Sequence, residues 1–149
     1  MSDTNVTQSP NTSAEATVLL WSADVGRILE WATVTLGLTE SWRAGGERSG
    51  VEHGELLWQP DQASAGNRIT ISSAREQYAN MGPSGISLRT SERALVDELH
   101  ERATTHGTEI IQGPEDSIVA YSFTAQDPDG NQWWVNAETG FLDKLRNPN

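Results

Sequence analysis

The chain has 149 residues, a formal net charge of −11 and no cysteine, which fits one domain without disulfides or thiolate metal sites. The acidic balance argues against nucleic acid, whose phosphates require a basic surface, and no stretch approaches the ~20 apolar residues of a membrane span. Because residues 1–15 also lack the apolar run of a signal peptide, we expect a cytoplasmic protein that binds neither nucleic acid nor membranes.

A strand, a helix and three more strands are predicted for the first half of the chain. The first strand covers residues 17–21, and Ser22 and Asp24 offer N-cap oxygens for a helix over residues 25–36. Apolar residues recur at helical spacing in that helix, and Gly37 is a suitable C-terminal stop. Glycine and proline separate the strands that follow, over residues 38–43, 52–59 and 68–73.

The same order is predicted again in the second half. A strand over residues 85–89 leads to Thr90 or Ser91, either of which can cap a helix that ends near residue 105. That helix carries an apolar stripe of Leu95, Leu99 and Ala103. The remaining elements are three strands and a short amphipathic segment, over residues 109–112, 119–126, 132–136 and 141–145.

The chain therefore contains the order βαβββ twice. This predicts an α+β fold in which two βαβββ modules pair their sheets into an incomplete barrel, with helices outside and a cavity within. We expect one domain over residues 16–149, preceded by a disordered tail over residues 1–15. Its expected parts are module one, a linker, module two and a C-terminal helical segment, over residues 16–74, 75–83, 84–137 and 138–149.

A tight hairpin turn is predicted at residues 127–131, which read Asp-Pro-Asp-Gly-Asn. Proline fixes φ, glycine supplies a positive φ, and Asp and Asn side chains bond the nearby backbone. Three further segments precede this hairpin, at residues 30–38, 51–56 and 95–110. Together and in this order, the four segments resemble the glyoxalase/bleomycin-resistance branch of the vicinal-oxygen-chelate superfamily. The resemblance covers about residues 16–137 and implies the fold described above.

Metal enzymes of this superfamily take one metal ligand from the first strand and one from the last strand of each module, usually His, Gln or Glu. The resemblance places Thr17, Thr70, Gly85 and Trp134 at those four positions. None of these residues is a typical ligand for a divalent metal. We therefore expect a metal-independent protein with no cofactor.

Strand alternation places residues two apart on the same face of a sheet. With the four ligand-equivalent positions facing the cavity, a set of aliphatic residues faces the helices: Val18, Leu20, Ile69, Ile71, Ile86 and Leu88. The candidate ligand-binding residues on the cavity face are Trp21, Arg68, Thr70, Ser87, Arg89, Gln132, Trp134 and Asn136. This mixture suits a pocket in which a few polar groups orient a small molecule among apolar walls.

Our leading hypothesis is that the protein binds a small organic molecule in this Trp-lined cavity. Trp21 and Trp134 would supply stacking surfaces, and Arg68 and Arg89 would pair with an anionic substituent. An acidic protein also suits a cationic antibiotic. The sequence leaves the charge of the ligand open.

Two other hypotheses stay open. His53 and Glu55 lie two residues apart on one predicted strand, so a glyoxalase-type lyase or isomerase could use either as a base, or could use a displaced metal site. Alternatively, the tryptophans fill a vestigial cavity in an interaction protein. The resemblance further implies a homodimer.

Overall fold

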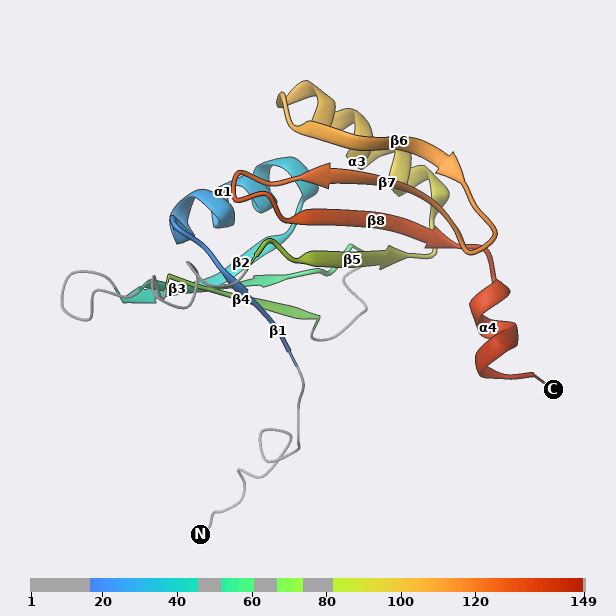
Figure 1. Cartoon of the computed structure of the whole chain (residues 1–149), viewed down its shortest axis with the longest axis horizontal. Coiled ribbons are helices and arrows are strands. Elements are labelled where there is room, and N and C mark those ends of the chain that lie inside the picture. Colours follow the sequence, from blue (N-terminus) through green and yellow to red (C-terminus); the bar gives the residue numbers. More distant parts are fainter. Residues whose placement is uncertain (1–16, 46–51, 61–66, 74–81, 149) are drawn as a thin grey trace, which may run out of the picture.

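Two four-stranded mixed sheets form the framework of the chain in the computed structural model, which describes residues 17–45, 52–60, 67–73 and 82–148 (Figure 1). The first sheet has the spatial order first, fourth, third and second strand, and consists of β1 (Val18–Trp21), β2 (Thr39–Gly45), β3 (Glu52–Leu57) and β4 (Arg68–Ser72). The second sheet has the same order, with β5 (Gly85–Thr90), β6 (Glu109–Asp116), β7 (Ala120–Gln126) and β8 (Gln132–Glu138). The α+β class and the repeated βαβββ order are confirmed, and the two sheets do not close into one barrel.

The helices lie between the first and second strands of each module and after the last strand. α1 (Val25–Leu36) packs on β3 and β4, whereas α3 (Arg93–Thr105) packs on β6, β7 and β8. α1 and α3 also contact each other, which joins the two modules. α4 (Phe141–Arg146) follows β8 and projects from the end of the second sheet (Figure 1). Among the described residues, no helix combines the length and the apolar character needed to cross a membrane.

The first and last strands of each module pair in parallel, and the other neighbouring strands are antiparallel. In this register Leu19 lies opposite Thr70, and Ser87 lies opposite Trp134. β1 and β5 are therefore edge strands, and each has a strand neighbour on one side only within the described chain.

Local signals predicted the first helix correctly. The Asp24 side chain accepts a hydrogen bond from the backbone N–H of Arg27 at 3.1 Å, so Asp24 is the N-cap. Gly37 follows the last turn with φ 73°, in the left-handed region that glycine adopts without strain. Both ends of α1 agree with the prediction.

The predicted caps of the second helix were wrong. The N-cap of α3 is Glu92, whose side chain makes no capping hydrogen bond. Thr90 is the last residue of β5, and its hydroxyl accepts a hydrogen bond from the backbone N–H of Glu92 at 3.1 Å. The buried stripe of α3 contains Val96, Leu99 and Ala103, with Leu95 only partly buried beside it.

β6 is longer than predicted. It continues past Pro114 to Asp116, because two register shifts against β7 accommodate a residue that cannot donate a ladder hydrogen bond. β8 likewise extends two residues beyond the predicted end, to Glu138. The predicted tail over residues 1–15 and most of the linker over residues 75–83 lie outside the described residues.

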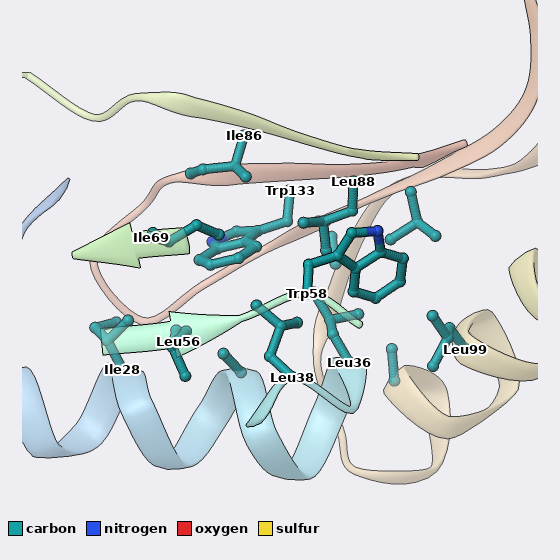
Figure 2. Close-up of a cluster of buried hydrophobic side chains, with 14 of the residues drawn as sticks. Ile28, Leu36, Leu38, Leu56, Trp58, Ile69, Ile86, Leu88, Leu99 and Trp133 are labelled. Carbon is teal, nitrogen blue, oxygen red and sulfur yellow. The ribbon is translucent and has the colours of Figure 1, made fainter. Parts of the chain in front are cut away.

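The predicted alternation of the strands is confirmed by burial. Five of the six aliphatic residues expected to face the helices are buried: Leu20, Ile69, Ile71, Ile86 and Leu88. Val18, at the start of β1, is instead 44 % exposed. Figure 2 shows Ile69 and Leu88 in one cluster with Trp58 and Trp133, on the sheet side of α1. This cluster is the shared core of both modules.

The turn between β7 and β8 is organised around the buried residue Asp127. Its carboxylate accepts hydrogen bonds from the backbone N–H groups of Asp129 and Asn131, each at 2.9 Å. It also accepts from the indole N–H of Trp133 at 2.8 Å and from the Asn131 amide at 3.0 Å. Burial raises the pKa of the Asp127 carboxyl, and these donors oppose that shift. Gly130 has φ 89°, and the predicted hairpin turn is confirmed.

Candidate functional site

A cleft of about 1020 Å³ lies between β5, the beginnings of β1 and β4, and the beginning of α4. Its apolar surface comes from core side chains, namely Trp58, Ile69, Ile86 and Leu88. Most of its lining residues are polar or charged, namely Thr17, Asn67, Arg68, Ser87, Arg89, Thr90, Ser91, Glu138, Thr139 and Asp143. A pocket that combines apolar walls with polar groups has the general character of a small-molecule site.

Trp58 connects the floor of the cleft to both modules. It follows β3, its side chain is 5 % exposed, and its backbone N–H donates to the carbonyl of Asn67 at 3.0 Å. Its indole N–H donates to the backbone carbonyl of Arg89 on β5 at 2.8 Å. The floor therefore comes from both modules, with Trp58 and Ile69 from the first and Ile86 and Leu88 from β5 of the second.

Carboxylates position the arginines of the cleft. Arg89 Nε lies 3.1 Å from Glu138 Oε2, and Arg146 Nη1 of α4 lies 3.5 Å from Glu138 Oε1. Arg68 Nε lies 3.9 Å from Glu55 Oε2. The Arg89 side chain is 53 % exposed. Its guanidinium is therefore held at the rim and accessible to a ligand.

Three of the eight predicted ligand-binding residues meet in this cleft, namely Arg68, Ser87 and Arg89. A fourth, Asn136, lies behind them and is 1 % exposed. Its amide donates to the Ser87 hydroxyl at 2.9 Å and to the Leu88 carbonyl at 3.2 Å. Asn136 therefore supports β5 from β8 and does not line the cleft.

The other four predicted residues lie on the sheet faces that point away from the helices. Trp21 and Thr70 are half-buried on the first sheet, and Trp134 is half-buried on the second sheet, where Gln132 is exposed. None of them lines the cleft. Trp134 shares the face of its register partner Ser87, whereas Trp21 lies on the other sheet, so within one chain the two tryptophans do not meet in the cleft.

His53 and Glu55 share this outward face of the first sheet, as predicted from their spacing. Both are half-buried, and Glu55 lies opposite Thr70 in the register of β3 and β4. The Glu55 carboxylate accepts a hydrogen bond from the Ser41 hydroxyl at 2.6 Å. Neither residue lines the cleft.

Sequence reasoning missed Trp58 and Glu138. Glu138 has the same strand parity as Trp134 and Asn136, so it would have been found if the last strand had been extended by two residues. Trp58 lies two residues after the core-facing Leu56, so alternation assigned Trp58 to the core. Nothing in the sequence indicated that the indole of Trp58 also borders a cleft.

The family model of the Glyoxalase/Bleomycin resistance protein/Dioxygenase superfamily matches residues 16–135 of the chain. The chain belongs to this superfamily. No protein of curated function matches it significantly.

Solved structures share the fold at low sequence identity. TioX from Micromonospora sp. ML1 is 20% identical with a TM-score of 0.65, and the match covers 85% of this chain and 99% of TioX. TnmS3, an antibiotic binding protein from Streptomyces sp. CB03234, is 18% identical with a TM-score of 0.66, over 85% of this chain and 98% of TnmS3. A superfamily member from Sphaerobacter thermophilus DSM 20745 is 20% identical with a TM-score of 0.64, over 84% of this chain and 98% of that protein.

The positions expected to hold metal ligands do not fit a divalent metal. Thr17, Thr70, Gly85 and Trp134 offer hydroxyls, an indole and no side chain, whereas such sites use imidazole, thiolate or carboxylate donors. In the part of the chain that the structure describes, no group of three or more His, Cys, Asp or Glu residues could hold a metal ion.

Proposed function

We propose that the protein binds a small organic molecule, without a metal ion, in the cleft between its two modules. The observation that carries this proposal is the cleft itself, with its volume of about 1020 Å³, its floor of core side chains and its rim that includes Arg89. Small-molecule sites typically enclose roughly 300–1,000 Å³ and combine apolar walls with a few polar groups. TnmS3, a structural neighbour, is an antibiotic binding protein. That relationship supports a binding role over a purely structural one.

A homodimer is part of this proposal. Leu19 and Trp42 are 47 % and 43 % exposed on the outward face of the first sheet, on its two edge strands, and exposed apolar side chains on one face support an interaction surface. A second copy that covers the outward faces would enclose Trp21 and Trp134 and complete the predicted Trp-lined cavity. Native mass spectrometry of the untagged protein should give a dimer mass, and a monomer mass at micromolar concentration would contradict this part of the proposal.

An organic anion tests the cleft directly. Anilinonaphthalene sulfonate should bind with enhanced fluorescence, because its rings suit the apolar floor and its sulfonate suits the Arg89 guanidinium. An Arg89→Leu variant should weaken this binding about tenfold, since a hydrogen bond to a charged group contributes about 1.5–3 kcal/mol. Prior dialysis against a metal chelator should leave the affinity unchanged.

Arg93→Leu is the matched control. Arg93 is an exposed arginine on α3 that pairs with Asp116 and does not line the cleft, so its removal should not alter probe binding. The organic cation acridine orange tests the opposite ligand charge. If it binds instead, and binds more tightly to Arg89→Leu, the ligand is cationic. Equal weakening in both arginine variants, or no binding of either probe, would overturn the proposed site.

The lyase or isomerase remains the second candidate, and one observation favours it. The Glu55 side chain is only 16 % exposed and is oriented by Ser41 and Arg68 on the face that also carries His53. Such an oriented carboxylate has the geometry of a general base. Loss of turnover in Glu55→Gln, with probe binding unchanged, would establish this activity.

A further inference from the structure

The edge of β5 presents backbone groups to the cleft. Among the described strands, β5 pairs with β8 alone. The backbone N–H of Gln132 donates to the carbonyl of Ser84 at 2.9 Å, which assigns the even-numbered residues of β5 to that pairing. The indole of Trp58 reaches β5 from the other side and donates to the carbonyl of Arg89. The N–H and C=O groups of Gly85, Ser87 and Arg89 therefore point away from β8.

The cleft follows this edge over its whole length. All the residues of β5, Gly85–Thr90, line it, as does Ser91. Within the described chain, Trp58 bonds the Arg89 carbonyl, and no hydrogen bond is formed to the N–H groups of Gly85, Ser87 and Arg89. In native proteins, proline, a bulge or lysine usually prevents an exposed edge strand from pairing with another chain. β6 has Pro114 and two register shifts, whereas β5 has neither proline nor a register shift, and its one charged residue, Arg89, is paired with Glu138.

We infer that the ligand of the cleft is a short peptide or peptide-like chain of amides that adds to the edge of β5 as an extra strand. This inference rests on the proposed function, since it specifies the chemistry of the molecule that the same cleft binds. Main-chain hydrogen bonds to a sheet edge give such complexes their affinity, and pockets for alternate side chains give them specificity. The edge between Gly85 and Arg89 spans about 13 Å at ~3.3 Å per residue, which accommodates four to five ligand residues.

The side chains around the edge specify the ligand further. Ile86 and Leu88 point toward the apolar floor with Trp58, whereas Ser87 and Arg89 point to the opposite face. Side chains of an added strand alternate in the same way. The ligand therefore carries apolar groups that face the floor and, beside Arg89, an acidic group that competes with Glu138 for the guanidinium.

Substitution of Ser87 tests this arrangement. Ser87→Pro removes the edge N–H donor and places a ring on the edge, without removing a hydrogen bond to β8. Ser87→Ala is the matched control, because both variants lose the hydroxyl that accepts from Asn136 while only the proline loses the N–H. The probe is a terminally blocked tetrapeptide that alternates Leu and Glu. We expect Ser87→Pro to weaken its binding at least tenfold and Ser87→Ala to change it less than about threefold, as measured by NMR titration at ~0.15 M salt.

A second measurement does not depend on the folding of the proline variant. Tetrapeptides methylated at the amide nitrogens that face β5 should lose affinity for the unmodified protein, whereas methylation of the intervening nitrogens should have little effect. Bound peptide should also slow amide hydrogen exchange at Gly85, Ser87 and Arg89.

Each contrary outcome has a distinct meaning. Unchanged peptide binding in a folded Ser87→Pro variant, or equal binding of both methylated peptides, would overturn the inference. If anilinonaphthalene sulfonate binds and no peptide does, the ligand class is wrong and the proposed function stands; if neither binds, both fall. A Ser87→Pro variant that loses the dimer mass would show that the edge pairs with a second copy, which also overturns the inference.

Discussion

An Asp127→Ala variant should lose about 3–4 kcal/mol of its free energy of unfolding, a large share of the roughly 5–15 kcal/mol typical of a domain. The Asp127 carboxylate accepts hydrogen bonds from two backbone N–H groups, the Asn131 amide and the Trp133 indole. Alanine leaves these donors without that acceptor, and Asn131 and Trp133 are buried, where each unsatisfied donor costs about 1–3 kcal/mol. Urea unfolding measures the loss as a lower midpoint at an unchanged m-value.

The effect should extend beyond the turn. Trp133 is fully buried, and its ring centroid lies 5.5 Å from that of Trp31 on α1. Asp129 accepts a hydrogen bond from the Ser22 hydroxyl at 2.6 Å, which connects the turn to the end of β1. Loss of Asp127 should therefore alter the near-ultraviolet circular dichroism of both tryptophans.

Asp127→Asn separates the acceptor role from the change in charge. It removes the same charge as alanine and keeps the shape of the side chain and one acceptor oxygen, while its amide N–H₂ opposes a neighbouring donor. We expect a loss of about 1–2 kcal/mol, smaller than that of Asp127→Ala. Losses below about 0.5 kcal/mol in both variants would show that the hydrogen bonds to Asp127 do not stabilise the turn.

The parts of the fold that were predicted correctly are those with local signals. Asp24 and Gly37 determine the two ends of α1 through their own backbone and side-chain geometry, so their residue types are sufficient. The start of α3 was missed because its N-cap, Glu92, makes no capping bond and its position depends on where β5 ends. β6 was predicted too short because Pro114 normally ends a strand, and its tolerance depends on the partner strand.

The candidate site was predicted only in part, for a similar reason. Alternation within a strand correctly grouped Ser87 with Arg89, because that property belongs to one strand. Trp134 shares its sheet face with Arg89, and Trp21 shares its face with Arg68, yet neither tryptophan lines the cleft. Where the cleft lies depends on how the two sheets are placed, which no spacing along the chain specifies. The cleft also depends on Trp58, whose indole crosses from one module to the other.

Trp58→Ala should lower the free energy of unfolding by about 3–5 kcal/mol, the usual cost of deleting a buried aromatic side chain. The indole of Trp58 is 5 % exposed, packs in the shared core shown in Figure 2 and bonds the carbonyl of Arg89. Because it contacts both modules, its loss should destabilise both together, as a single cooperative transition in urea. Two separated transitions would show that the modules unfold independently.

Trp58→Phe isolates the hydrogen bond from the packing. Phenylalanine keeps an aromatic ring in the floor and removes the N–H donor, so we expect a loss of about 1–2 kcal/mol in the free energy of unfolding. Ile118→Ala is the surface control, since Ile118 is 70 % exposed and should change stability by less than about 0.5 kcal/mol. If Trp58→Phe is as destabilising as Trp58→Ala, the hydrogen bond to Arg89 dominates. If both cost no more than Ile118→Ala, Trp58 does not join the two modules.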